Sequence, residues 1–278
     1  MAGFIHCVRF RTPTGYLTSG AGAADSSFPH ANAADIVHPH RPWKSSGSVS
    51  IGSTYYGVDF GAAVQLAAVA IDNTNVQTVT LEAADDTAFS TNLIQQAVII
   101  GENQVERSLF TTSQGITLGR SKAFINLDGT DFDSAARRYW RIVAGAASVD
   151  SDEPKFFIGS VAWCRAITTW SSGTSSYEET PIEATRPNDD FAGGGAEPVI
   201  LGNGTSSVAL GAAPGERATM RASVLELLRE GIGRPFLFYK NDGDTADFYI
   251  CHRSSDVTIK QTSPNTIEFQ QLIMRNAV

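Results

Sequence analysis

The chain has 278 residues, a formal net charge of −8 at pH 7, and 18% charged residues. This length accommodates two domains of ordinary size, each with its own apolar core. The acidic balance and the dispersed lysines and arginines argue against a dedicated binder of nucleic acid or of anionic membranes, because such binders carry a basic surface. No apolar run approaches the length that crosses a bilayer, so no membrane insertion is expected.

The cysteines, Cys7, Cys164 and Cys251, are far apart and odd in number. This pattern disfavours a disulfide framework and matches no zinc motif, so buried thiols are expected. Residues 1–10 lack the charged region and continuous apolar run of a signal peptide. We therefore expect synthesis and folding in a reducing cytosol.

Residues 1–30 predict an N-terminal arm, in which one short strand candidate precedes a stretch rich in glycine, alanine and serine. Residues 31–167 predict short strands separated by turns. Residues 77–83, for example, alternate Val79 and Leu81 with threonine and glutamate, which is typical of a half-buried strand. Such a succession predicts a mainly β domain, a sandwich or barrel.

Residues 168–198 predict a linker, because they contain a run of three glycines, several serines and three prolines. Residues 199–278 predict a second β-domain, a sandwich or barrel flanked by one helix over residues 216–230. The apolar stripe of that helix comprises Met220, Val224, Leu227 and Leu228.

Four segments in the first domain form a recognisable order. Arg41-Pro-Trp-Lys-Ser-Ser-Gly47 precedes Tyr56-Gly-Val-Asp-Phe-Gly61, and Ala136-Arg-Arg-Tyr-Trp-Arg-Ile-Val143 precedes Phe157-Ile-Gly-Ser-Val-Ala-Trp163. The order resembles the discoidin, or galactose-binding-like, β-sandwich, also called the F5/8 type C fold. The resemblance implies a jelly-roll sandwich of a kind that binds or attaches far more often than it catalyses.

The C-terminal residues carry a second, less specific resemblance. After the helix come Gly231-Ile-Gly-Arg-Pro-Phe-Leu-Phe-Tyr239, then Tyr249-Ile-Cys251 and a terminal Thr266-Ile-Glu-Phe269. This order is similar to the small β-domains of siphophage tail-tip and distal tail proteins. It implies a location in the virion tail after synthesis in the host cytoplasm, assembly into a ring-like homo-oligomer, and contact with other tail proteins.

The discoidin resemblance also implies candidate ligand residues. Trp43, Tyr55 and Tyr56 lie in or near the loops that such domains use for ligands, where aromatic rings stack on sugars. Arg41 and Lys44 would bond sugar hydroxyls. The alternative for Trp43 is packing beneath its loop.

Asp128-Gly-Thr-Asp-Phe-Asp133 brings three carboxylates close together in one loop. Discoidin-like modules often hold a structural calcium, so Asp128, Asp131 and Asp133 are the candidate metal ligands, and no other cofactor is expected. Their spacing misses the EF-hand pattern, which leaves a solvated turn as the alternative.

Other polar clusters carry weaker signals. His30, His38 and His40 fit no zinc spacing, so an interface or loop role is favoured. Asp85 and Asp86 are available for glycoside hydrolysis, but adjacent aspartates are common in turns. No catalytic motif has the context that it requires, so the chain is not expected to be an enzyme.

The sequence therefore favours a structural protein of a bacteriophage tail, at or near the tail tip or baseplate. One alternative is a non-catalytic carbohydrate-binding adhesin that holds a host surface glycan. Another is an accessory module of a glycan-active enzyme.

Overall fold

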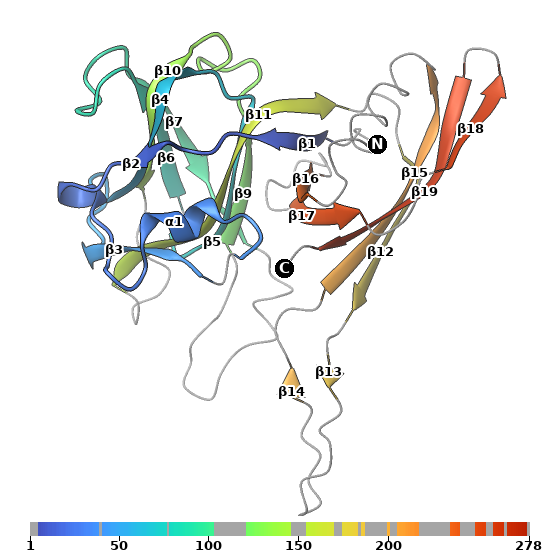
Figure 1. Ribbon diagram of the computed structural model, residues 1–278, viewed down its shortest axis with the longest axis horizontal. Helices are drawn as coiled ribbons and strands as arrows, with labels where there is room; N and C mark the ends of the chain where they lie inside the picture. The colour runs from blue at the N-terminus through green and yellow to red at the C-terminus, as the bar shows by residue number, and fades with distance from the viewer. Residues whose placement is uncertain are drawn as a thin grey trace, which may run out of the picture. The chain divides into compact units, whose positions relative to one another are not determined.

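The structure is a computed structural model, shown in Figure 1. It describes residues 5–38, 41–76, 78–102, 121–145, 154–169, 174–182, 185–186, 199–200, 205–216, 234–239, 248–253, 258–263 and 266–276. The chain divides into two compact units. We call Ile5–Thr168 with Phe238–Phe248 the sandwich unit, and Thr169–Leu237 with Tyr249–Val278 the C-terminal unit.

The described residues are mainly β-strand, which confirms the predicted fold class. Within them the helical elements are short: one 3-10 turn, η1 (Gly20–Gly22), and one α-helix, α1 (His30–Ala34). Helix α1 lies beside a strand of the sandwich unit, β3 (Trp43–Ser48). No helix among these residues is long and apolar enough to cross a membrane.

One layer of the sandwich unit is an antiparallel five-stranded sheet. Its strands, in spatial order, are β2 (Gly15–Tyr16), β4 (Tyr55–Val64), β10 (Arg137–Ala144), β6 (Thr78–Ala84) and β7 (Ile94–Ile99). On β10, Trp140 lies opposite Val58 on one side and Ala83 on the other. This register turns all three side chains toward the same face.

The other layer is built around a long strand, β11 (Lys155–Thr169). Within the unit the spatial order is β1 (Ile5–Phe10), β11, β5 (Ala68–Thr74), β9 (Ser121–Asn126) and β8 (Gly101–Glu102), with β3 also pairing β11. Apolar residues of both sheets meet in one shared core. Two sheets around one core form the β-sandwich that the sequence predicts.

Tryptophans occupy the centre of this core. Trp140 and Trp163 are at most 1% exposed, and their ring centroids lie 6.3 Å apart. Trp140 also stacks on Phe132 at 5.4 Å, and Trp163 meets Phe60 edge-on at 5.8 Å. Burying side chains of this size supplies much of the apolar driving force for folding.

The four segments that carry the discoidin resemblance are paired in space. The Asp-Phe-Gly strand is β4, and it pairs with the basic-aromatic strand β10. The tryptophan segment is β3, and it pairs with the closing strand β11. Asp59 on β4 accepts two hydrogen bonds of 2.8 Å from Arg138 on β10. These bonds hold the pKa of Asp59 below its usual value.

Gly61 ends this motif in the left-handed region, with φ of +74°. A Cβ at Gly61 would lie 3.0 Å from the Thr14 hydroxyl oxygen, whereas Gly52, with φ of +75°, has open space around it. We expect Gly61→Ala to lower the free energy of unfolding by about 2 kcal/mol and Gly52→Ala by about 1 kcal/mol. Both alanines would be held in the unfavourable left-handed region, but only the alanine at 61 would also press against Thr14. Urea titrations of both variants measure the difference, and equal losses would contradict the contact with Thr14.

The predicted N-terminal arm, residues 1–30, does not match the structure. β1 and β2 are strands of the two sandwich sheets, and Ile5 and Cys7 are 2% and 1% exposed. β1, the short strand candidate near the start of the chain, pairs with strands more than a hundred residues away in the sequence. A short apolar strand of this kind becomes part of a core only through long-range pairing, which local sequence does not report.

The C-terminal unit is also built from antiparallel strands. They are β12 (Thr174–Ile182), β15 (Thr205–Glu216), β18 (Thr258–Ser263), β19 (Thr266–Asn276) and most of β17 (Phe248–Arg253), with a separate pair, β13 (Thr185–Arg186) and β14 (Val199–Ile200). β12 lies inside the predicted linker, residues 168–198, and pairs with β15 from Thr174↔Ala212 to Ile182↔Thr205. The linker prediction is therefore wrong over β12, because a backbone ladder orders a segment of polar composition. The helix predicted over residues 216–230 lies outside the described residues, except for Glu216, which ends β15.

The predicted start of the second domain at residue 199 also needs correction. Phe238–Phe248 belongs to the sandwich unit, including the end of β16 (Phe236–Tyr239). The Tyr239 ring stacks on Phe124 of β9 with centroids 4.4 Å apart, and the Lys122 ammonium donates to the Phe248 carbonyl at 3.2 Å. The sandwich unit is thus completed by residues from near the end of the chain.

Candidate interaction site

Two of the predicted ligand residues are core residues. Trp43 and Tyr56 are both 0% exposed. The Trp43 ring meets Tyr56 edge-on at 5.3 Å and Phe156 at 5.5 Å, because the β3–β11 pairing places Trp43 opposite Ile158. Neither ring can stack on a sugar from this position, so the ligand role predicted for these two residues is wrong and the packing alternative for Trp43 is correct.

The other three predicted ligand residues do not form one site. Arg41 is exposed in the loop before β3. The Lys44 ammonium lies 4.6 Å from the centroid of the Phe28 ring. Tyr55 is on the other sheet, where the Arg141 guanidinium lies 5.0 Å from its ring. The structure therefore separates Lys44 from Tyr55 and gives each a different cation–π partner.

The predicted metal ligands lie in an exposed turn. Asp128, Asp131 and Asp133 all have exposed side chains, and the turn closes over Phe132, which is 1% exposed. Among the residues that the structure describes, no group of histidine, cysteine or acidic side chains could hold a metal ion. The calcium prediction at these aspartates has no geometric support, because adjacent carboxylates in a chain do not by themselves converge on one point.

The predicted histidine cluster is dispersed as well. His30 is buried among aromatic rings and donates from Nε2 to the Gly22 carbonyl at 2.8 Å. His38 pairs with Asp35 at 2.7 Å on the surface, and His40 lies outside the described residues. Burial lowers the pKa of His30, so its neutral form is favoured.

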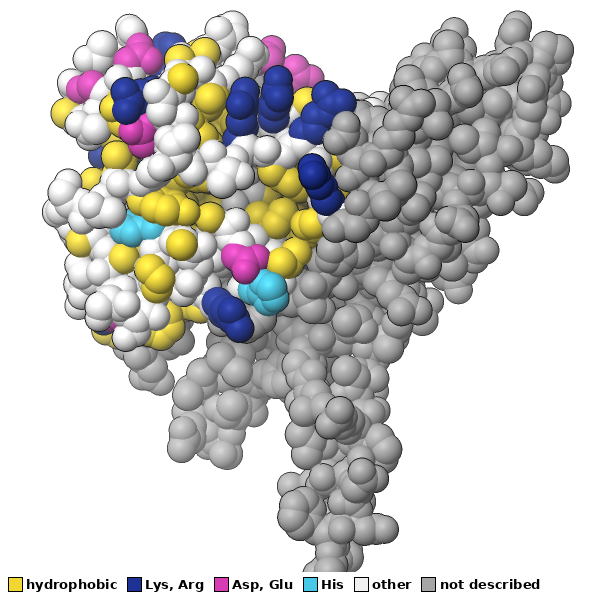
Figure 2. Space-filling model, in the orientation of Figure 1, with side chains coloured by type: hydrophobic (Ala, Val, Ile, Leu, Met, Phe, Trp, Pro, Cys, Tyr) yellow, Lys and Arg dark blue, Asp and Glu magenta, His cyan; other side chains and the backbone are white. Residues whose placement is uncertain are grey.

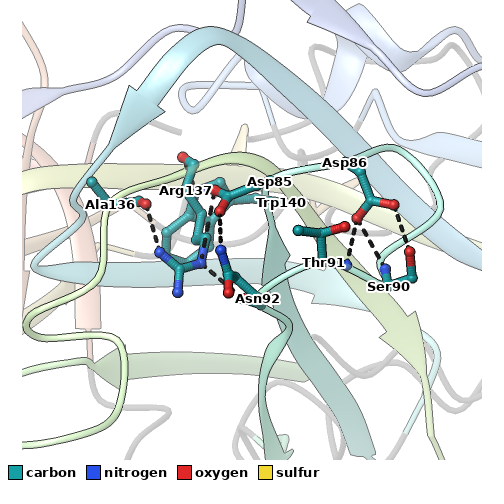
Figure 3. A network of polar contacts seen from close by, with 8 residues as sticks. All are labelled: Asp85, Asp86, Ser90, Thr91, Asn92, Ala136, Arg137 and Trp140. Atoms are coloured by element: carbon teal, nitrogen blue, oxygen red, sulfur yellow. Dashed lines mark hydrogen bonds and ion pairs between the residues drawn. The ribbon is translucent and has the colours of Figure 1, made fainter.

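Asp86 organises the loop between β6 and β7 (Figure 3). It accepts hydrogen bonds from the Thr91 amide at 2.8 Å, the Ser90 amide at 3.0 Å and the Ser90 hydroxyl at 2.7 Å. The backbone bond from Thr91 and the bond from Ser90 lower the pKa of Asp86. A glycosidase acid needs a raised pKa, so this carboxylate fits a loop-forming role.

A second set of contacts ties the same loop to the core. Asp85 accepts from the Asn92 amide group at 2.8 Å, and the Arg137 guanidinium donates to the Asn92 carbonyl at 2.8 Å. The Trp140 indole in turn donates to the Arg137 carbonyl at 3.0 Å. These bonds fix the point at which β7 begins, just after Asn92.

Charged groups on the outer face of the five-stranded sheet are paired near its centre. The Arg141 guanidinium lies between the rings of Phe89, at 3.9 Å, and Tyr55, at 5.0 Å, and donates to Glu82 at 2.6 Å. Both partners of this ion pair are mostly buried, with exposed fractions of 22% for Arg141 and 12% for Glu82. Arg138 and Asp59 form the neighbouring pair on the same face of β10 and β4.

The outer face changes character at β6 and β7. Val79, Leu81 and Ala83 of β6 point into the core, so the residues between them point outward. On β7 the exposed positions are Gln95, Ala97 and Ile99. We call five uncharged outward residues of these two strands the neutral strip, namely Thr78, Thr80, Gln95, Ala97 and Ile99; the strip ends on β6 at Glu82, which lies opposite Gln95 and is paired with Arg141.

Three large apolar side chains are exposed among the described residues, and one of them, Ile99, belongs to this strip. They are Ile99, 76% exposed, Ile51, 57% exposed, and Leu93, 41% exposed. Leu93 immediately precedes β7, and Ile99 is its last residue. The loop of Ile51 is joined to β10 by the Gly52 amide, which donates to the Ala144 carbonyl at 2.8 Å. The strip, which includes Ile99, forms the candidate interaction site together with Leu93 and Ile51, because large apolar side chains exposed beside an uncharged surface are typical of sites of association.

Charge is unevenly distributed over the rest of the sandwich unit. Figure 2 shows several basic side chains side by side over β1 and β11, with acidic side chains next to this row and further charged side chains of both signs scattered over the face. A sequence of eight residues without charge, proline or glycine, Leu93-Ile-Gln-Gln-Ala-Val-Ile-Ile100, is the signal that could have drawn attention to β7. Sequence alone did not distinguish this strand from a central one.

No protein-family model matches the chain, and no curated protein sequence matches it significantly. Among solved structures it is similar to chitosan-binding module 1 of a chitosanase/glucanase from Paenibacillus sp. IK-5, with 15% identity, a TM-score of 0.35, and coverage of 56% of this chain and 96% of the module. A chain of reduced XRCC1 bound to the DNA pol beta catalytic domain matches with 12% identity, a TM-score of 0.39, and coverage of 58% and 99%.

The lectin domain of lectinolysin, solved with Lewis B antigen, matches with 11% identity, a TM-score of 0.33, and coverage of 51% of this chain and 88% of the domain. Likeness at this level concerns the fold alone. The β-sandwich itself follows from the strand order and shared core of this chain.

Proposed function

We propose that the chain is a non-catalytic assembly protein, a structural component of a bacteriophage tail at or near the tail tip or baseplate. It acts by contact with copies of itself and with other tail proteins, and it contributes to attachment at the host surface. Its location is the virion tail. The order of segments in residues 199–278 supports the tail assignment through its resemblance to siphophage tail-tip and distal tail proteins.

The observation that carries the assembly role is the candidate interaction site. Ile99 is 76% exposed on an uncharged strip of a well-packed sheet. Exposing an apolar surface to water costs free energy, and this cost is removed when another protein covers the surface. The charged groups near the centre of the same face are already paired with each other, which leaves the strip as the part of the face that gains most from being covered.

Two aspartates that the sequence makes available for hydrolysis, Asp85 and Asp86, have structural roles. Asp86 shapes the β6–β7 loop and Asp85 bonds Asn92. Asp150, Asp152 and Glu153, also available for hydrolysis, lie outside the described residues. Hydrogen bonds lower the pKa values of three described aspartates, Asp25, Asp59 and Asp86. These carboxylates therefore fit structural hydrogen bonding better than acid catalysis, which needs a raised pKa.

The glycan-binding alternative has less support from the geometry. Its aromatic platform needed Trp43 and Tyr56, and both are buried. Tyr55 remains half-buried with Arg141 against its ring. Binding of a polysaccharide by the purified chain would support this alternative.

The test uses antibodies against the whole chain on phage particles from a strain that carries its gene. We expect immunogold label at the distal end of the tail and none on particles treated with pre-immune serum. In parallel, the purified chain is examined by mass photometry and screened for hydrolysis and binding of polysaccharides. Particles that lack the chain, together with a monomer that cleaves or binds a polysaccharide, would contradict the proposal and support one of the glycan alternatives.

A further inference from the structure

The five-stranded sheet ends in a strand with one described partner. β7 pairs with β6 from Thr78↔Ile99 to Ala83↔Ile94, and it is the last strand in the order of this sheet. No other strand in the described part of the chain pairs with it. Along its second side, alternate amide and carbonyl groups therefore point away from β6, as they do on any edge strand.

Edge strands of natural sheets are protected against pairing with other chains by shortness, charge or proline. The opposite edge of the same sheet, β2, has two residues. β12, at the end of the sheet in the C-terminal unit, contains Glu178, Glu179 and Pro181. β7 has none of these features over its six residues, and Leu93 and Ile100 on either side are also uncharged.

We propose that β7 pairs with β7 of a second copy of this chain, antiparallel and about a two-fold axis perpendicular to the sheet. The two five-stranded sheets then form one continuous sheet. The proposal rests on the proposed assembly function and names the partner of its interaction site, which is the chain itself.

Electrostatics permit a second copy at this edge. Each chain carries a net charge of −8, so two copies repel one another over most approaches. Between two β7 strands no like charges face each other, because the strand has no ionisable side chain. A strand that meets its own copy must be compatible with its own reversed sequence, and an uncharged strand meets that condition.

The register follows from the faces of the strand. A two-fold axis perpendicular to the sheet keeps each outer face on the same side, so outward residues meet outward residues. With the axis at Ala97, Ala97 lies opposite Ala97 of the copy, and Gln95 lies opposite Ile99. The small alanine permits close approach at the centre, and each Gln95 stem covers the exposed Ile99 of the other chain.

This contact closes on two copies, because it is the same surface on both. The ring-like oligomer expected of a tail protein therefore needs a second, different contact. The buried surface of one strand pair is small, so we expect the isolated dimer to have a dissociation constant of roughly 1–100 μM.

The experiment is sedimentation velocity on the full chain, with like charges placed at the centre of the pair. We expect Ala97→Lys and Ala97→Glu each to weaken dimerisation by at least about tenfold, because the two new charges face each other. An equimolar mixture of these two variants should associate within about threefold of wild type, since a lysine then faces a glutamate. Ala62→Lys is the matched control: Ala62 is also an exposed alanine on this sheet, on β4, and its substitution should leave association unchanged.

Thermal melts establish that each variant is folded before it is sedimented. Wild type that remains monomeric at the highest concentration, Ala97→Lys that associates as well as Ala62→Lys, or a mixture no better than its components would each overturn β7 pairing. Fibres of wild type without a discrete dimer would overturn it too. Label at the tail with no effect at Ala97 would overturn this inference alone, whereas absence of the chain from tails would overturn the proposed function.

Discussion

Trp43→Ala is expected to lower the free energy of unfolding by about 3–5 kcal/mol, one of the largest effects available to a single substitution in this chain. Trp43 is 0% exposed and contacts Tyr56 and Phe156 edge-on, so its removal leaves a cavity in the shared core. Urea unfolding followed by circular dichroism measures the loss. Marginal stability makes an insoluble or unfolded product an equally clear sign of a core role.

Two variants keep that prediction specific. Trp43→Phe retains an aromatic ring in the core and should cost only about 1–2 kcal/mol. Tyr55→Ala removes another aromatic residue of the predicted ligand set, but one that is half-buried on the outer face, and should cost about 1 kcal/mol. If Trp43→Ala unfolded at the same urea concentration as wild type, Trp43 would be a surface residue and the ligand hypothesis would return.

Acid is expected to destabilise the sandwich unit well above the pH at which carboxylates titrate. Burial lowers the pKa of His6 from 6.5 to about 4, and burial also lowers that of His30. Because each folded-state pKa lies below the unfolded value, the unfolded chain binds the proton first and stability falls as pH falls below about 6.5. For His6 alone the loss reaches about 3 kcal/mol by pH 4.

Urea titrations between pH 7.5 and pH 4 measure this slope. His6→Gln should flatten it whatever its effect on stability at pH 7.5, since the titrating group is gone. His38→Gln is the control, because His38 is 45% exposed and pairs with Asp35 at the surface. A wild-type slope that survives in His6→Gln would assign the acid sensitivity to other groups.

The layered β architecture of the sandwich unit could be predicted because its signals are local and chemically distinct. The alternation around Val79 and Leu81 sets which face of β6 is buried. The four segments that suggested a discoidin-like sandwich do pair as β4 with β10 and β3 with β11. For Trp43 the sequence leaves both a ligand role and core packing open, because a tryptophan beside a polar loop can face either way, and the structure places it in the core.

The failures share one physical origin, which is that strand pairing over long sequence distances leaves no local signature. β1 and β12 lie in segments assigned to an arm and a linker, and each becomes a strand through a partner distant in sequence. Phe238–Phe248 joins the sandwich unit for the same reason. Calcium binding at Asp128, Asp131 and Asp133 stays a prediction without geometric support, since closeness in sequence does not make side chains converge.

The edge position of β7 could not be predicted either. Its composition marks an apolar strand, and only the sheet order shows that it has no described partner beyond β6. The contacts of Asp86 and Arg137 that fix its starting point are equally invisible in the sequence. Assembly through this edge thus rests on features that only the folded chain presents.

Amide hydrogen exchange of the wild-type chain, at a concentration well below and one well above its dissociation constant, tests assembly through β7 most directly. A peptide that spans residues 93–100 reports the strand, and one within β4 reports a strand away from the edge. We expect alternate amides of β7 to exchange more slowly at the high concentration, because they become bonded to the second copy, while β4 is unchanged. Exchange from residues 93–100 that is the same at both concentrations, in a sample shown to be associated, would contradict assembly through this strand.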